Sequence, residues 1–443
     1  MNQRKSGFGP YLGVTFLIGF GFLTMGLMDP LYDTYVPLFL SAYLESHTAV
    51  GALMTVDNIL QLALIPVIAL WSDRTRTRLG RRMPFIVVML PLSAILFSFL
   101  PQAAALSLLA LLALIFVFNI FKTSVRGPVV ALMPDTVPAE YRSEANGIIN
   151  TMGGVGLIIS TLVLARLINS RILPPSFPPA ALPFGIAALC ILAAVLVLVL
   201  LVREKLPDNA GTETKTPVLA AIRRVFTGEA KSSVGRILIA LFCWFLAYEG
   251  IKPFLGLYLV NYVGVDEGSA ALAQGVAGIS GVLLAFPSGA LAHRLGRRRF
   301  IRLCLGALTV ILLVIPLSGL AAGRLGLGPR LLVFLALMFI YGIFWIGVVV
   351  NSFPMLWQMA DYSTMGIYTG LYYTFSQTAA ILAPPLSGAV IDFFGYPGLF
   401  VFGAAAMLAA WFVMAGVRAG EPSGEPAEKS PDSGEAAESA GSR

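Results

Sequence analysis

Long apolar stretches alternate with short polar segments along almost the whole chain. Twelve of the stretches have about the 20 mostly apolar residues that an α-helix needs to cross the hydrocarbon core of a bilayer. They predict membrane-spanning helices at residues 11–40, 48–71, 84–101, 104–133, 143–168, 181–202, 236–262, 270–292, 300–320, 331–357, 366–392 and 396–418. The pattern therefore predicts an all-α integral membrane protein with twelve transmembrane helices in the lipid bilayer.

The composition agrees with this interpretation. Of the 443 residues, 57% are hydrophobic and 12% are charged, whereas soluble domains contain about 25% charged residues. The three cysteines, Cys190, Cys243 and Cys304, all fall in apolar spans. Because they are odd in number and far apart, we expect buried apolar side chains and no disulfide framework.

The distribution of positive charge predicts the orientation of the helices. If the N-terminus is cytoplasmic, most of the 30 Lys and Arg residues fall in cytoplasmic segments, and the outer loops hold Arg166, Arg171, Arg324 and Arg330. Positive charge collects on the cytoplasmic side of membrane proteins. We therefore expect a multi-pass protein of the cell (inner) membrane with both termini in the cytoplasm. The net charge of +7 follows from this topology, and no nucleic-acid partner is expected because aromatic residues do not interleave with the basic ones.

An internal repeat divides the chain into two halves. RLGRR occurs at 78–82 and again at 294–298, and an acidic-x-x-x-Pro pattern at 33–37 recurs at 249–253 with the same offset. Six-span repeats around a site at the midplane are typical of transporters. The predicted architecture is two pseudo-symmetric six-helix bundles around a central cavity, formed by residues 1–202 and 236–418. A cytoplasmic loop (203–235) joins them, and a disordered tail (419–443) follows, since it has no apolar residues beyond alanine.

Two loops carry a family resemblance. WSDRTRTRLGRRMPF in the first half and SGALAHRLGRRRF in the second resemble the loop signature of the major facilitator superfamily. The longer version, together with RGPVVALMPD (126–135), EANGI (144–148) and GIYTGLYY (366–373), is similar to the sucrose–proton symporter group of plants, animals and bacteria. The glycoside–pentoside–hexuronide cation symporters are more distantly similar. Ala69, Val130 and His293 stand where those relatives have Gly, Arg and Asp. We expect the chain to function as a monomer.

Charged residues inside the predicted spans form the candidate coupling network. Lys122 and Arg126 are four residues apart in the fourth span, as are Asp29 and Asp33 in the first, so each pair shares a helix face. The resemblance implies that spans 1, 4, 7 and 10 line the cavity with span 1 facing span 4, so the two pairs should meet. An unpaired charge at the bilayer centre costs about 2.5–3.5 kcal/mol. The network is either a fixed structural one or one that changes partners with protonation, with Asp33 and then Asp29 as proton acceptor.

Span 7 adds Glu249 and Lys252, three residues apart, which form either a local pair or a contact across the cavity. Glu249 is a second candidate coupling carboxylate. The expected substrate-binding residues are aromatic or hydrogen-bonding side chains of the central spans: Tyr32, Asp57, Asn58, Asn119, Asn351, Trp357, Gln358, Tyr372, Tyr373 and Gln377. Such side chains also serve in helix packing, which is the competing interpretation for each, and Asp57 could instead contribute to a cation site.

The repeated loops predict a gate at the cytoplasmic edge, where charges pair when the inner side closes. The gate residues are expected to be Asp73, Arg74, Arg78, Gly80, Arg81, Arg82, Asp135, Arg142, Glu144, Arg294, Gly296 and Arg297. Simple anchoring by positive charge is the alternative role for the arginines. Gly147, Gly153, Gly154 and Gly156 predict close packing of the fifth span.

The sequence thus predicts a secondary active transporter that carries a sugar, a disaccharide or other glycoside, with protons by alternating access. Sodium-coupled sugar symport and proton-coupled export of other small molecules are the transport alternatives. A membrane sensor or enzyme is the remaining alternative. The chain has two histidines, His47 and His293, and no span has metal-ligand spacing or a nucleophile motif. We therefore expect no enzymatic activity, no metal site and no cofactor beyond the coupling ion, H⁺ or Na⁺.

Overall fold

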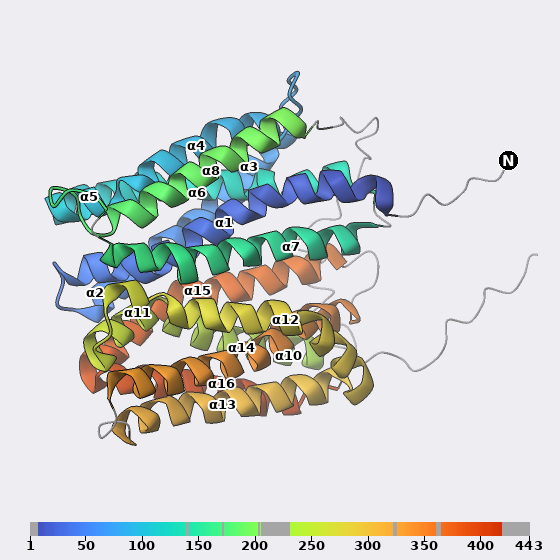
Figure 1. The fold of residues 1–443 in the computed structure, drawn as a ribbon. Coiled ribbons are helices and arrows are strands. Elements are labelled where there is room, and N and C mark those ends of the chain that lie inside the picture. The colour runs from blue at the N-terminus through green and yellow to red at the C-terminus, as the bar shows by residue number, and fades with distance from the viewer. Residues whose placement is uncertain are drawn as a thin grey trace, which may run out of the picture.

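The computed structural model describes residues 8–138, 141–170, 172–202, 204, 231–321, 326–359 and 365–418. The regular elements among them are helices that run side by side in one bundle (Figure 1). Most of the predicted central loop and the whole predicted tail, 419–443, lie outside the described residues.

The helices of the first half occupy the upper part of Figure 1. They are α1 (Gly9–Ser41), α2 (His47–Met54), α3 (Val56–Arg74), α4 (Met83–Ser98), α5 (Leu100–Leu106), α6 (Leu108–Thr136), α7 (Arg142–Ile158) with its continuations η2 (Ile159–Leu164) and η3 (Ala165–Asn169), and α8 (Ala181–Leu201).

The helices of the second half occupy the lower part of Figure 1. They are α10 (Lys231–Ile251) with its continuations η4 (Lys252–Phe254), α11 (Leu255–Leu257) and η5 (Tyr258–Val263), then η6 (Glu267–Ser269), α12 (Leu272–Leu295), α13 (Arg297–Ala321), α14 (Leu327–Trp357), α15 (Met365–Phe394) and α16 (Tyr396–Ala415).

Each of the twelve predicted spans coincides with one of these helical segments. Ten segments of the described chain are long and apolar enough to cross a membrane, and the pair α4 and α5, bent by 42°, makes an eleventh. The remaining segment, α15, has the length but contains Gln377, Pro384, Pro385 and several Ser and Thr residues, which lower its hydropathy. Part of α15 packs against α2 of the other half.

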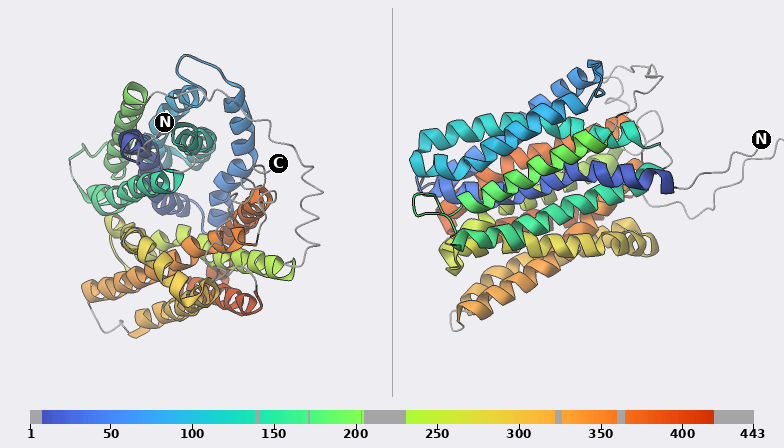
Figure 2. Two further views of the ribbon diagram at one scale, coloured as in Figure 1. Left: turned by 90° about the vertical axis from the view of Figure 1, so that its right-hand side faces the viewer. Right: turned by 45° about the horizontal axis from the view of Figure 1, so that its top comes forward.

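The two halves repeat the same helix contacts. In the first half α1 packs on α7, α3 on α6 and α4 on α8. In the second half the corresponding pairs are α10 with α15, α12 with α14 and α13 with α16. This repetition is the pseudo-symmetry that the sequence repeat indicated, and the end-on view in Figure 2 shows the two groups of helices next to each other.

Two spans are interrupted where the halves meet. Thr55 separates α2 from α3, and its hydroxyl donates to the carbonyl oxygens of Gly51 and, in the other half, Ile381. Span 7 tightens into a 3₁₀ turn at Lys252–Phe254, where Pro253 has no amide hydrogen to continue the α-helical pattern. The halves contact each other mainly through α2 and α15, α7 and α12, and α1 and the interrupted span 7.

Glycines allow α1 and α7 to approach closely. A Cβ atom on Gly156 would lie 2.5 Å from the carbonyl oxygen of Leu23, and Gly153 also faces the α1 backbone at Phe22. Gly154 instead faces Val282 of the other half, and a Cβ on Gly147 would meet nothing within 4 Å. The predicted close packing therefore holds for the glycines around the crossing and is wrong for Gly147, which lies beyond it.

We expect Gly156→Ala to destabilise the protein, because the added methyl group collides with backbone that cannot rotate away. Overpacking of this kind costs about 1–3 kcal/mol, and the change is measured as a lower melting temperature in detergent. Gly147→Ala on the same helix is the matched control and should leave the melting temperature unchanged or slightly raised. Equal shifts in the two variants would contradict the close contact.

Candidate functional site

A polar cavity lies between the halves, and we refer to it as the charged lobe. It has a volume of about 140 Å³ and is lined by Asp29, Asp33, Met54, Asp57, Asn58, Gln61, Lys122, Arg126, Glu249, Lys252, Pro253, Gln377 and Pro384. The helices α1, α3 and α6 supply its wall in the first half. The interrupted span 7 and α15 supply the wall in the second half.

Lys122 and Asp29 form the closest ion pair of the first-half wall. The Nζ atom of Lys122 lies 2.8 Å from Oδ1 of Asp29, and the Arg126 guanidinium lies 3.6 Å from Oδ2 of the same carboxylate. Asn119 donates a hydrogen bond of 2.8 Å to the hydroxyl of Tyr32, whose ring lies 4.6 Å from Lys122 Nζ. The predicted meeting of Asp29 with both cations is confirmed. The Tyr32 ring packs against Lys122, and the hydrogen bond from Asn119 holds Tyr32 in place.

Asp33 has a different partner from the one that the spacing predicted. Its carboxylate lies 3.0 Å from Nζ of Lys252, on the other half of the protein, instead of contacting Lys122 or Arg126. Lys252 also lies 3.6 Å from Glu249 on its own helix. Lys252 therefore makes both predicted contacts, the local pair with Glu249 and the contact across the cavity. Asp33 is one helical turn beyond Asp29, and its partner Lys252 is the first residue of the 3₁₀ turn.

The charges of the lobe do not balance. Four carboxylates, on Asp29, Asp33, Asp57 and Glu249, share three cations, on Lys122, Arg126 and Lys252. Asp57 has the weakest pairing, because its nearest cation, Lys122, is 4.0 Å away and closer to Asp29. The Asp57 side chain is only 12% exposed. A buried carboxylate without a close counter-ion is costly in its charged form.

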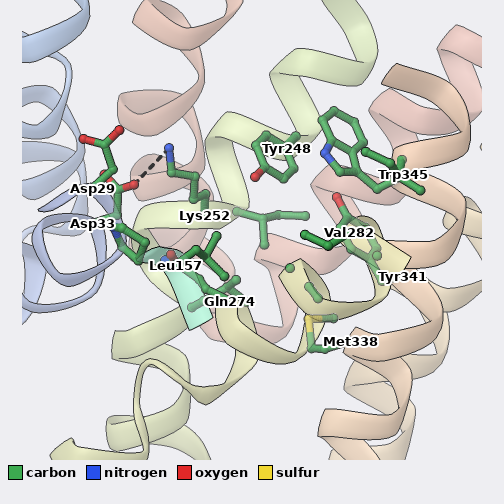
Figure 3. Close-up of a pocket in the computed structure, with 18 of the residues that line it drawn as sticks. Asp29, Asp33, Leu157, Tyr248, Lys252, Gln274, Val282, Met338, Tyr341 and Trp345 are labelled. Carbon is green, nitrogen blue, oxygen red and sulfur yellow. Dashed lines mark ion pairs between the residues drawn. The ribbon is translucent and has the colours of Figure 1, made fainter. Parts of the chain in front are cut away.

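A second cavity continues from the charged lobe into the second half, and we call it the aromatic lobe. Its volume is about 320 Å³, and it shares Asp29, Asp33 and Lys252 with the charged lobe. Figure 3 shows these charged residues at one end and aromatic side chains at the other. The distinctive lining residues are Tyr248, Gln274, Tyr341 and Trp345, with Leu157, Val282, Met338 and other apolar neighbours.

The sequence analysis missed the aromatic lobe, although two spacings pointed to it. Tyr248 precedes Lys252 by four residues, and Tyr341 precedes Trp345 by four, so each pair shares a helix face. Aromatic residues are so common in membrane spans that this signal alone does not distinguish a cavity from a packed core.

Several predicted substrate residues lie elsewhere in the structure. Asp57, Asn58 and Gln377 do line the charged lobe, and Asn58 also donates to the Ala380 carbonyl oxygen across the halves. Asn351 and Tyr372 are buried in helix packing, where they bond Gly347 and Ser352. Neither lines a lobe. Three more lie away from both lobes: Trp357 donates to Thr369, Gln358 follows the end of α14, and Tyr373 is 58% exposed.

The predicted gate residues of the first half form a dense charge cluster. Arg81 binds Asp135 with both carboxylate oxygens engaged, at 3.0 and 2.5 Å, and Arg82 binds Asp135 at 2.9 Å as well as Asp73. Although burial alone would lower the pKa of Arg81, the hydrogen bond and charge of Asp135 raise it. The sequence analysis missed Glu204, which accepts a hydrogen bond of 2.8 Å from the Arg82 amide.

The other predicted gate residues lie at turns, at helix ends or on the exposed surface. Gly80 and Gly296 adopt positive φ angles of 106° and 84°, a backbone conformation that glycine adopts without strain. Arg142 donates to carbonyl oxygens at the end of α6. Arg297 is the first residue of α13. The remaining predicted gate residues are exposed: Arg74, Arg78, Glu144 and Arg294.

An unpredicted contact joins the halves at the opposite end of the molecule. Asp392, near the end of α15, accepts hydrogen bonds from the backbone amides of His47 and Thr48, at 2.8 and 2.9 Å. The hydroxyls of Ser46 and Thr48 also donate to it, at 2.9 and 2.7 Å. Because the amides belong to the first turn of α2, one carboxylate of the second half caps a helix of the first. We call this contact the Asp392 cap.

Two further contacts close the same end. The Tyr35 hydroxyl donates to the Glu267 carbonyl oxygen at 2.9 Å, and Asn169 donates to Asp266 at 2.5 Å. Although burial alone would raise the pKa of Asp266, hydrogen bonds from Asn169 and Ser269 lower it. Hydrogen bonds and ion pairs thus join the halves between the charged lobe and this end of the molecule.

Comparisons with known proteins agree with the architecture. Residues 14–379 match the family model of the Major Facilitator Superfamily. Among solved structures, a mutant of the nucleoside transporter NupG is similar, with a TM-score of 0.69 at 13% identity over 91% of this chain and 100% of that chain. No protein with a curated description matches the chain in sequence.

Two other solved structures share the fold. A bacterial homolog of the human lysosomal transporter Spinster, inward-facing and unoccupied, has a TM-score of 0.63 at 15% identity over 93% of this chain and 95% of that chain. A POT family transporter in complex with a thioalcohol-conjugated peptide has a TM-score of 0.67 at 14% identity over 93% of this chain and 97% of that chain. At these identities the likeness shows the fold alone.

We expect Asp392→Asn to weaken the closed end, because the amide loses the charge and half of the acceptor capacity that hold α2. In a background without native cysteines, spin labels at Ala42 and Tyr262 report the distance between the halves. The variant should increase the population with longer distances several-fold. Glu45→Gln, an exposed carboxylate at the same end, is the control, and identical distance distributions in both variants would refute the role of the Asp392 cap.

Proposed function

Since the chain belongs to the major facilitator superfamily, we propose that it is a secondary active transporter that moves a sugar together with protons by alternating access. The observation that carries this proposal is the network of buried charges in the charged lobe, between two six-helix halves. Ionisable side chains inside a membrane protein are costly, and they usually belong to a substrate or ion pathway.

The chemistry of the charged lobe suits a polyhydroxylated ligand. The amides of Asn58, Gln61 and Gln377 both donate and accept hydrogen bonds, and the lobe adds carboxylate acceptors and the forked donor of Arg126. Each sugar hydroxyl is likewise both donor and acceptor. The Arg126 side chain is 42% exposed, so it is available to a ligand in a way that buried Lys122 is not.

The contacts between the halves support a defined conformation. They close the end that contains the Asp392 cap, whereas at the other end the ion pairs of Arg81 and Arg82 with Asp135 lie within the first half. The positive charges suggest that both termini lie on the cytoplasmic side of the cell membrane. The lobes would then open toward the cytoplasm. Rocking of the halves would then break the Asp392 cap and bring the two gate loops together.

Asp57 is our candidate for the coupling carboxylate, in place of Asp33, the first proton acceptor predicted from the sequence. The groups that interact with it electrostatically are Lys122, Asp29, Asp33, Lys252 and the hydroxyl of Tyr32. Asp29 and Asp33 each have a cation within about 3 Å, whereas Asp57 does not. One proton on Asp57 would balance the four carboxylates against the three cations, so proton uptake would favour the arrangement that accepts a neutral sugar.

The transport proposal is tested with purified protein in proteoliposomes that contain a pH-sensitive dye. Addition of a transported sugar should acidify the lumen, and the signal should persist when sodium is replaced by choline. Uptake of labelled sugar that proceeds without acidification and is lost in choline would favour the sodium-coupled alternative. Sugar uptake without any movement of protons or sodium would contradict coupled symport.

We expect Asp57→Asn to separate sugar movement from proton movement. Exchange of labelled sugar across the membrane at equal concentrations should continue, while accumulation driven by a pH gradient should fall by about tenfold or more, because the amide cannot exchange a proton. Asp33→Asn is the comparison variant and should impair exchange itself, since it leaves Lys252 without its 3.0 Å partner. Normal accumulation by Asp57→Asn would exclude Asp57 as the coupling group.

A further inference from the structure

The aromatic lobe differs from the charged lobe in chemistry, and this difference bears on what the transporter carries. Beyond the shared charged residues its walls are apolar, with Ile251, Leu312, Met338 and Ile346 among them. Its polar side-chain groups at that end are the hydroxyls of Tyr248 and Tyr341, the amide of Gln274 and the indole N–H of Trp345. A single elongated ligand that fills both lobes must therefore have two ends of opposite polarity.

Parallel rings form one wall of the aromatic lobe. The rings of Tyr248 and Trp345 are stacked with centroids 4.1 Å apart and planes 7° apart, and Tyr341 lies 6.5 Å from Trp345 with planes 8° apart. Phe245 packs edge-on against the Trp345 ring and helps to hold the indole in place. Tyr248 and Trp345 cover each other on their facing sides, so a further flat group can pack by offset stacking on an outer face of this stack.

Two hydrogen-bonding groups in the aromatic lobe have no partner among the described residues. The Nε2 atom of Gln274 and the hydroxyl of Tyr341 are both buried and unbonded. Tyr341 is only 6% exposed, and both side chains line the lobe (Figure 3). Buried polar atoms normally have partners. The lobe is therefore prepared for a ligand group that is largely apolar and has one or two hydrogen-bonding atoms.

A second sugar ring would fit this lobe poorly. Such a ring brings several hydroxyls into a mostly apolar space with four polar side-chain groups, and each hydroxyl left there without a partner weakens binding. An aromatic or other flat apolar ring would bury its faces against Trp345 and its neighbours without that loss. The balance of polar groups disfavours a disaccharide and favours an amphipathic molecule.

We propose that the substrate is an amphipathic glycoside, with one sugar ring in the charged lobe and a flat apolar aglycone in the aromatic lobe. The inference rests on the proposed sugar transport and narrows it from glycosides in general to those with an apolar ring. Gln274 and Tyr341 hold a hydrogen-bonding atom of the aglycone, and Trp345 packs against its face.

Binding to the purified full-length protein in nanodiscs tests the proposal with matched pairs of ligands. Phenyl β-glucoside is compared with cellobiose, and phenyl β-galactoside with lactose, so that each pair shares its first sugar ring. We expect the phenyl compound of the pair that is recognised to bind about tenfold tighter or more, equivalent to about 1.4 kcal/mol. Equal or tighter binding of the disaccharide would overturn the proposal and leave sugar transport standing.

Variants identify where the aglycone binds. Trp345→Leu should weaken binding of the phenyl glycoside about tenfold and leave binding of the free monosaccharide unchanged. Tyr341→Phe, which keeps the ring, should weaken binding several-fold when the phenyl group carries a nitro acceptor. Tyr258→Phe, a buried tyrosine that lines neither lobe, is the control. The melting temperature without ligand verifies that each variant folds.

Two other outcomes are decisive. If the Trp345 variant weakened phenyl glycosides and monosaccharides equally, the separate role of the aromatic lobe would be wrong. If no sugar compound bound but a phenylalkylammonium amphiphile bound in a Trp345-dependent way, sugar transport would be refuted while the amphipathic character of the site would stand.

Discussion

The structure depends on the need to keep every charge inside the membrane region close to another charge or to a polar cavity. The ion pair between Asp33 and Lys252 meets this need across the two halves, and the pair between Lys122 and Asp29 meets it within one half. An isolated charge at this depth costs about 2.5–3.5 kcal/mol on insertion scales. Movement of the halves must therefore either preserve the Asp33–Lys252 pair or supply new partners, and substrate and protons are the available ones.

The two lobes divide the work of recognition between the halves. The first half contributes most of the charge, through Asp29, Asp57, Lys122 and Arg126, while the second half contributes the aromatic wall. A ligand that occupies both lobes contacts both halves at once. Such a ligand can stabilise the arrangement in which the two walls lie closest, which is what alternating access requires of a substrate.

The sequence predicted those features that depend on local periodicity. The spans followed from hydropathy, and the contact of Asp29 with Lys122 followed from matching four-residue spacings on facing helices. It did not predict the partner of Asp33, because Lys252 lies on a helix of the other half, far away in the sequence. Glu204, Asp392 and Trp345 were missed for a related reason. Each acquires its role from a residue far away in the sequence, and one sequence contains no record of such contacts.

The Asp392 cap links the order of a helix to the position of a domain. The short helix α2 has eight residues, and its first amides are held by a carboxylate of the other half. When the halves separate at this end, α2 loses that support, a change that costs about 1 kcal/mol for a typical cap. The His47 and Thr48 amides would then need water or another acceptor in place of Asp392. The barrier between conformations would include this exchange of hydrogen bonds as well as a rigid rotation.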